Sequence, residues 1–365
     1  MTAEHLKPLT SMRFLAAMWV VMFHYWPALD VAVLPGAVAK GYLGVELFFV
    51  LSGFILSHVY LQAAGERTFR YGAFLWARLA RIYPLHLATL AGVGLMAGAA
   101  TVAGMAIDGN ILSWRSLPAN LLMVHAWGFA PDAGWNHPSW SISAEWFAYL
   151  LFPAFAWVAW RLRERPGVAL IGATLGLMGL YAVFERLAGF PLTQATIHWG
   201  ALRIVPCFAY GCAAYLAWRK GGLSRPGLFA AACAGLIAVA AGLQLWDGLI
   251  VALFGPLILA LASLARDGAG WLAARPAVYL GEISYSVYMV CVPWKLLAVN
   301  GAARLTGAVD DQLNLWVWLA VVAAIPLIAA ASYHLIEKPA RQGMRRFAER
   351  RRRPAAAPAA ANGAA

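Results

Sequence analysis

Two ionisable side chains share the first apolar stretch of the sequence and could carry chemistry there. Arg13 and His24 are eleven residues apart, about three helical turns, so both side chains would lie on one helix face. At 1.5 Å per residue they would be ~16 Å apart along the axis. Each has an ordinary explanation: a topology-setting cation for Arg13 and a hydrogen-bonded core residue for His24. Charges inside a bilayer are costly, however, and the shared face favours a common polar channel.

A carboxylate and two hydroxyl groups in other apolar stretches are further candidates. Ser141 and Glu145 are four residues apart near the start of the fourth stretch, so they would share a helix face. Glu145 lies about one turn inside an apolar helix and needs a partner, and a buried basic group such as His24 would serve. Ser52 precedes Gly53 in the middle of the second stretch. A Ser-Gly pair at that depth favours close helix packing over a catalytic serine by about two to one.

Two arginines follow the second apolar stretch in the sequence RLARIYP. Arg78 and Arg81 are three residues apart, which places them on one helical face. Planar guanidinium groups grip phosphate well, so the functional interpretation is a clamp for a nucleotide-bearing donor in the cytoplasm. Spacing alone favours the simpler explanation, that these cations set orientation. Near the end of the chain, Glu337 beside Lys338 is interpreted as a surface pair at the membrane edge.

The elements that must position these residues follow from composition. The chain has 365 residues, of which 62% are hydrophobic and 12% charged, with a mean hydropathy of +0.67. A soluble domain carries about 25% charged residues, so we exclude a soluble or disordered chain and predict an all-α, polytopic integral membrane protein. Because a span needs about 20 apolar residues, we expect about ten transmembrane helices, at residues 10–29, 42–62, 84–106, 141–160, 168–187, 199–218, 228–245, 248–265, 279–299 and 313–336.

The placement of the cations predicts orientation and argues against nucleic-acid binding. The net charge is +12, but the basic residues gather in links between apolar segments and at 338–353. Their alternation along the chain puts both termini in the cytoplasm, beside anionic lipid headgroups. We expect one transmembrane domain over 1–340 and a basic, then Ala- and Pro-rich, disordered tail over 341–365. The segment 107–140 would lie outside the membrane, with an apolar run at 117–130 that is too short to span.

Two negative expectations complete this outline. The first apolar stretch lacks the small-residue cleavage site of a secretory signal peptide, so we expect it to remain in the protein. The four cysteines lie in apolar stretches without metal-ligand spacing, so we expect neither a disulfide framework nor a metal site.

Six motifs, taken in order, resemble those of the membrane acyltransferase family 3, the bacterial O-acyltransferases of polysaccharides and some small molecules. They are RFLAAMWVVMFHY, GVELFFVLSGFIL, RLARIYPLH, WSISAEWFAYLLFP, GEISYSVYM and SYHLIEKP. The first is similar to the family's Arg-x10-His signature, and together they extend from residue 13 to residue 339. Two departures are Cys291, where the family often has His, and the lack of an appended periplasmic domain, which predicts a transmembrane-only member.

The resemblance implies transfer of an acyl group, commonly acetyl, from cytoplasmic acyl-CoA to a hydroxyl of a carbohydrate or glycolipid acceptor. His24 would be the general base, with Glu145 as its orienting partner. Arg13 would bind the donor or stabilise charge in the transition state, and Arg78 and Arg81 would hold the CoA phosphates. The resemblance also implies a location in the inner membrane of a bacterium and no permanently bound cofactor. Further expected substrate contacts are Ser52, Trp140, Ser141 and Tyr285.

A secondary transporter or flippase of a glycolipid or acyl compound is the main alternative. Ten spans with intramembrane Arg, His and Glu suit a transporter equally well. The charged motifs, however, fall in the first, second, fourth and ninth segments instead of in two symmetric halves, and no internal repeat is visible. A non-catalytic scaffold would leave the buried charges unexplained. The acyltransferase interpretation is therefore favoured, chiefly by the resemblance.

Overall fold

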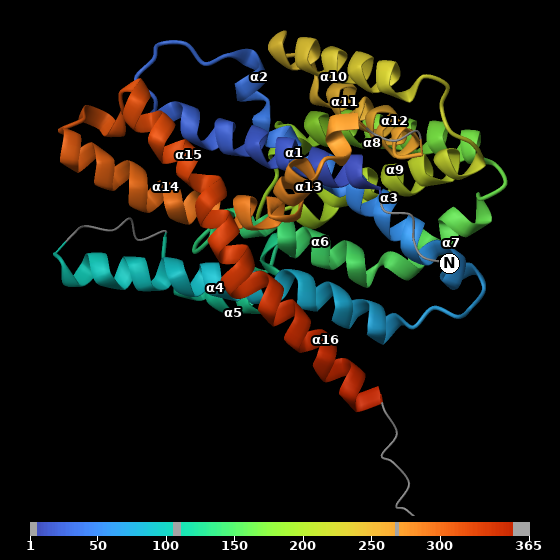
Figure 1. The fold of residues 1–365 in the computed structure, drawn as a ribbon, viewed down its shortest axis with the longest axis horizontal. Helices are drawn as coiled ribbons and strands as arrows, with labels where there is room; N and C mark the ends of the chain where they lie inside the picture. The colour runs from blue at the N-terminus through green and yellow to red at the C-terminus, as the bar shows by residue number, and fades with distance from the viewer. Residues whose placement is uncertain (1–5, 105–110, 267–269, 353–365) are drawn as a thin grey trace, which may run out of the picture.

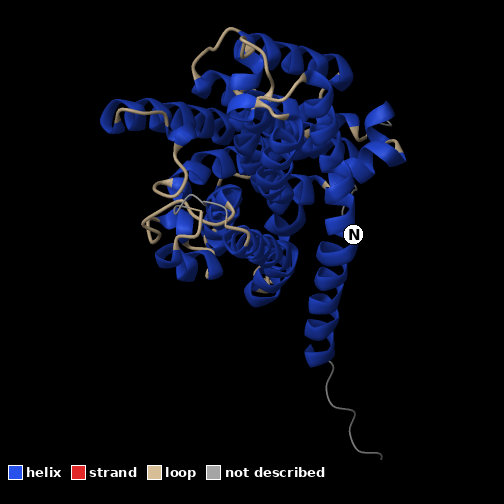
Figure 2. Cartoon of the chain, turned by 90° about the vertical axis from the view of Figure 1, so that its left-hand side faces the viewer, coloured by secondary structure: helices blue, strands red, loops and turns tan. Residues whose placement is uncertain are grey.

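The computed structural model describes residues 6–104, 111–266 and 270–352, and this part of the chain folds into helices joined by loops (Figure 2). The three described stretches form one helical bundle, from which the last helix extends (Figure 1). The α-helices are α1 (Lys7–Tyr25), α2 (Gly36–Ala39), α3 (Gly44–Gly65), α4 (Tyr71–Val102), α5 (Leu117–Leu121), α6 (Trp140–Leu150), α7 (Phe152–Arg161), α8 (Pro166–Ala188), α9 (Gly200–Lys220), α10 (Pro226–Gly242), α11 (Asp247–Ala252), α12 (Phe254–Leu264), α13 (Arg275–Glu282), α14 (Ser284–Thr306), α15 (Leu315–Ser332) and α16 (Lys338–Arg352).

Each of the ten expected spans coincides with helix, but fewer of them are long and apolar enough to cross a membrane. Seven helices in the described residues meet that standard, and the bent pair α6–α7 makes an eighth. Helix α10 has 17 residues and falls short, and α1 is made less apolar by Lys7, Arg13 and His24. The protein is therefore a multi-pass membrane protein, whereas the expected count of ten spans is not confirmed.

The fourth expected span is broken in its middle. Helices α6 and α7 meet at Leu151 and are bent by 56°. Pro153 lies in the first turn of α7, where its missing N–H group costs nothing, but it cannot continue an unbroken α6. The break leaves α6 as a short helix whose first turn lies inside the bundle.

Helices α3 and α9 pack together at the centre of the bundle, with small residues on both sides of the contact. A Cβ atom at Gly53 would overlap the backbone of Phe208, and one at Gly211 would overlap the backbone of Val50. Only glycine permits this approach of the two backbones. The prediction that the Ser52–Gly53 pair marks close helix packing is confirmed for the glycine.

The C-terminal part of the chain differs from expectation. Helix α15 continues through a π-helical turn at Tyr333–Glu337 into α16, which leaves the bundle and carries most of the terminal cations (Figure 1). The expected disordered tail is thus helical as far as Arg352, and residues 353–365 lie outside the described part. Glu337 is buried, with 2% of its side chain exposed, so the expected surface pair with Lys338 is wrong. The Glu337 carboxylate accepts a hydrogen bond of 2.8 Å from Ser286.

Candidate functional site

A cavity of about 140 Å³ lies where α1, α3, α4, α6 and α14 meet, and we call it the arginine cavity. Its walls include seven of the nine side chains that the sequence singled out, contributed by segments up to 272 residues apart. These seven are Arg13, Ser52, Arg78, Arg81, Ser141, Glu145 and Tyr285. The remaining two, His24 and Trp140, line a neighbouring cavity.

Glu145 is the carboxylate of the arginine cavity. Its Oε1 atom accepts a hydrogen bond of 2.7 Å from Ser52 on α3 and one of 2.5 Å from Tyr149, one turn further along α6. Two short bonds to one oxygen hold the carboxylate in place. Arg13 lies within electrostatic reach of this group. The expected pairing of Glu145 with His24 is not found, because the two side chains line different cavities.

Two of the three arginines of this cavity, Arg13 and Arg78, lie near aromatic rings. The guanidinium of Arg13 lies 6.0 Å from the ring centre of Phe48, and that of Arg78 lies 5.8 Å from Tyr60 and 6.0 Å from Phe74. The Nε atom of Arg78 is buried and has no hydrogen-bond partner within the described chain. Cationic groups with free donors in a recess suit a ligand rich in anionic oxygens, such as phosphate.

The neighbouring space, about 550 Å³, is lined by His24 and is called the histidine cavity. The Nδ1 atom of His24 lies 2.9 Å from the carbonyl oxygen of Val20. A carbonyl only accepts, so Nδ1 carries a proton, and in the neutral ring Nε2 has the lone pair. His24 is thereby held in the tautomer that a general base needs. His137, which lies in the same wall, was in the outer segment of the sequence but received no role there.

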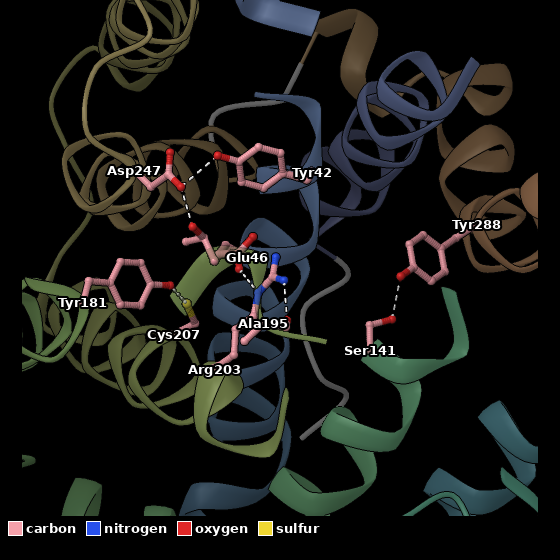
Figure 3. Close-up of polar contacts among 10 residues, drawn as sticks. Tyr42, Glu46, Ser141, Tyr181, Ala195, Arg203, Cys207, Asp247 and Tyr288 are labelled. Carbon is pink, nitrogen blue, oxygen red and sulfur yellow. Dashed lines mark hydrogen bonds and ion pairs between the residues drawn. The ribbon is translucent and has the colours of Figure 1, made fainter. Parts of the chain in front are cut away.

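Arg203, which lines the histidine cavity, belongs to a buried ion pair that the sequence did not reveal. Arg203 of α9 pairs with Glu46 of α3 and donates a bond of 2.8 Å to the carbonyl of Ala195 (Figure 3). Its guanidinium lies 4.5 Å from the ring centre of Trp140. One terminal nitrogen of Arg203 and one oxygen of Glu46 have no further partner among the residues described. Each residue is an isolated charge in an apolar segment, and this is the signal by which the sequence could have identified it. The sequence gives no sign that the two pair with each other across 157 positions.

A second charged pair closes another side of this cavity. Lys40 lies 2.5 Å from the carboxylate of Asp247, which also accepts a bond from Thr193. The same carboxylate accepts a bond of 2.9 Å from Tyr42 (Figure 3). Lys40, Tyr42 and Thr193 all line the cavity. Lys40 and Arg203, the two cations of the wall, are thus each paired with a carboxylate. The wall also presents hydroxyl groups to the cavity. Such a lining suits a neutral, hydroxyl-rich ligand better than a charged one.

The two cavities are neighbours that share part of a wall. Val45 and Tyr288 line both of them. The Ser141 hydroxyl donates a bond of 2.8 Å to the Tyr288 hydroxyl (Figure 3). The Tyr288 hydroxyl itself donates to the carbonyl of Pro138 at 2.9 Å. Tyr285, one turn earlier on α14, is fixed by a bond of 2.6 Å to the carbonyl of Ile82. These contacts hold a thin tyrosine wall between the arginines and His24.

The cysteines lie away from this chemistry. All four are free and buried, and none lines either cavity. The Cys291 thiol contacts the carbonyl of Tyr288 within its own helix at 3.1 Å. The described residues contain no group of three or more potential metal ligands.

Comparisons with known proteins agree with these features. A family model described as an acyltransferase domain matches residues 8–334. The chain is 28% identical over 329 residues to the acyltransferase MdmB of Streptomyces mycarofaciens, covering 82% of this chain and 80% of that protein. It is 27% identical over 314 residues to the exopolysaccharide production protein ExoZ of Rhizobium meliloti, covering 82% and 89%.

A third relative is longer than this chain. The peptidoglycan O-acetyltransferase OatA of Listeria monocytogenes is 25% identical over 371 residues, covering 93% of this chain and 56% of that protein. The chain therefore spans little more than half of that relative. No solved structure matches this chain.

Proposed function

The chain belongs to the membrane acyltransferase family, and we propose that it moves an acyl group from acyl-CoA to a hydroxyl of a carbohydrate or glycolipid. The observation that carries the proposal is the shared wall of two unlike cavities. One has arginines suited to a phosphorylated donor, and the other has a histidine base and a charge-balanced lining suited to a hydroxyl-rich acceptor. Relatives named for O-acetylation of peptidoglycan and for exopolysaccharide production support an acetyl donor and a polysaccharide acceptor.

In this proposal the donor lies on the arginine side. Arg78 and Arg81 hold the CoA phosphates, and Arg13, deeper in the bundle on α1, faces the acyl end together with Glu145 and Ser52. The positive charge of Arg13 would stabilise the oxyanion that develops on the thioester carbonyl. Glu145 then acts on the donor side, by fixing Ser52 and balancing Arg13, instead of orienting His24.

The acceptor lies on the histidine side, with Trp140 and Arg203 in its wall. The acceptor hydroxyl gives its proton to Nε2 of His24 as its oxygen attacks the thioester carbonyl. The C–S bond then breaks, CoA leaves as the thiolate, and the proton passes to that sulfur. Donor and acceptor therefore meet beside Tyr288, which lines both cavities, and the reaction takes place at their boundary.

Orientation and location belong to the same proposal. Both termini lie in the cytoplasm of a bacterium, the protein lies in its inner membrane, and α16 is beside the acyl-CoA pool. Reporter fusions after Gly65, Arg165 and Gly222 should therefore read as cytoplasmic, and a fusion at Gly307 as external. The opposite pattern would place the arginine cavity on the wrong side for acyl-CoA.

The function itself is tested by mass spectrometry of surface polysaccharide from cells with and without this gene. We expect ester-linked acyl groups on one glycan to disappear with the gene and to return with the parent sequence, but not with His24→Ala. If the glycan is exported less but keeps its acyl groups, the transporter alternative replaces this proposal.

A further inference from the structure

Helix α16 lies against the part of α4 that carries the donor arginines. The indole N–H of Trp76 donates a bond of 2.8 Å to the carbonyl of Met344, and the rings of Trp76 and Phe347 are 6.1 Å apart. Trp76 is two positions before Arg78 on α4. The helix that leaves the bundle in Figure 1 is therefore anchored next to the arginine cavity.

This anchoring brings two more arginines to the same place. Arg345 lies within electrostatic range of Arg341, Arg78 and Arg81. Arg341 and Arg345 are one turn apart on α16, so they present one face. Arg341 lies 3.8 Å from the buried carboxylate of Glu337, and no ion pair with an acid is found for Arg345 within the described residues.

The charges of this region do not balance. Five arginines face two glutamates, in contrast to the matched pairs of the histidine cavity. The residues are Arg13, Arg78, Arg81, Arg341 and Arg345 against Glu145 and Glu337. Like charges held this close repel, so their arrangement is favourable only when an anion joins them. CoA carries a pyrophosphate and a 3′-phosphomonoester, together about four negative charges near neutral pH.

We propose that Arg341 and Arg345 of α16 bind the 3′-phosphate of the CoA donor, beside the pyrophosphate held by Arg78 and Arg81. The inference rests on the proposed function, which makes acyl-CoA the donor. Arg345 is exposed, whereas the partly buried Arg13 lines the arginine cavity with Arg78 and Arg81, as expected for a ligand with its phosphomonoester outside and its thioester inside. A phosphomonoester, with nearly two charges and three acceptor oxygens, suits two guanidinium groups one turn apart.

The test compares two probes that differ only in this phosphate. Isothermal titration measures binding of CoA and of 3′-dephospho-CoA to the full chain in nanodiscs of neutral phosphatidylcholine. The parent should bind CoA at least about tenfold more tightly, as expected for charge-assisted hydrogen bonds. Arg345→Gln should reduce this preference, and Arg341→Gln with Arg345→Gln should abolish it while leaving binding of 3′-dephospho-CoA unchanged. Arg346→Gln, one position away on a different face, is the matched control and should preserve the preference.

Several outcomes would overturn this site. Equal binding of both probes by the parent would reject the 3′-phosphate site and leave the donor assignment standing, whereas no binding of either probe would reject the donor assignment itself. A lipid phosphate is the competing ligand for the same arginines. If the double variant keeps its preference for CoA but loses binding to vesicles that contain phosphatidylglycerol, α16 binds lipid headgroups instead.

Discussion

The hydroxyl of Ser141 on α6 and the hydroxyl of Tyr288 on α14 form a hydrogen bond of 2.8 Å at the boundary of the two cavities. Both groups also bond to the carbonyl of Pro138, which precedes α6. The hydroxyl of Tyr288 is therefore fixed, and its ring lines the boundary between the arginines and His24. In the proposed reaction the ring of Tyr288 fills the space through which water would otherwise reach the thioester when no acceptor is bound.

Removal of the Tyr288 side chain should increase the hydrolysis of acyl-CoA by water. Tyr288→Ala opens a path for water, so CoA release without acceptor should rise on the order of tenfold as acyl-CoA is hydrolysed. Tyr288→Phe keeps the ring and should release CoA at nearly the parent rate. Free CoA thiol, measured with a thiol reagent in the absence of acceptor, checks both variants. Equal rates in all three proteins would mean that Tyr288 does not keep water from the thioester.

Replacement of His24 should separate chemistry from donor binding. His24→Ala removes the base, and loss of a general base typically costs about 10² to 10⁴ in rate. Because His24 lies outside the arginine cavity, binding of CoA should be unchanged. The reaction rate is followed by mass spectrometry of the acylated glycan, in cells whose membranes contain equal amounts of each protein. The affinity for CoA is measured by titration. The exposed His334 provides the control, since His334→Ala should change neither.

Conservative changes at the cavity arginines should weaken use of the donor. Arg78→Lys or Arg81→Lys keeps the charge but loses the planar fork that grips phosphate. The loss should fall chiefly in KM for acyl-CoA, with kcat nearly unchanged, because the phosphates lie far from the reacting carbonyl. The two changes should be non-additive, since the side chains share one ligand. Arg161→Lys, where the arginine covers Trp157, is the control. Normal KM values in both Lys variants would assign Arg78 and Arg81 to orientation alone.

The buried pair Glu46–Arg203 should show strong coupling in stability. Arg203→Met leaves the Glu46 carboxylate buried and unpaired, which costs about 3–5 kcal/mol. Adding Glu46→Met removes that charge and should restore most of the thermal stability of the purified protein. Activity should stay low in the double variant if the free nitrogen of Arg203 contacts the acceptor. A double variant no more stable than Arg203→Met alone would contradict this account of the pair.

His125 should make stability depend on pH. Burial lowers the pKa of His125 to about 3, from an ordinary value near 6.5, and the stacked ring of His86 adds to this effect. Below about pH 6.5 the unfolded chain takes up a proton that the folded chain does not, so stability falls as pH falls toward about 3. The thermal midpoint of His125→Gln should therefore drop less than that of the parent between about pH 7.5 and about pH 5. His198→Gln, at an exposed histidine, should match the parent, and a parallel drop in all three would rule out His125 as the cause.

Local composition was enough to predict the membrane class and the positions of the helices. Hydropathy is a property of neighbouring residues, so α3, α8 and α9 appear close to their expected bounds. The sequence alone could not show that the fourth span breaks at Leu151 or that the tail is helical to Arg352. The bend at Leu151 and the helix that extends from the bundle depend on tertiary packing, which local composition does not reveal.

The sequence by itself also singled out most of the side chains of the arginine cavity, because charges in apolar stretches are visible without a fold. Only the tertiary structure decided their partners: Glu145 bonds Ser52 instead of His24, and Arg203 pairs with Glu46. The same holds for the division into two cavities, which depends on the position of Tyr288. The reason is physical: burying a charge demands a partner, but any of several distant groups can satisfy that demand, and the packing of the helices determines which one does.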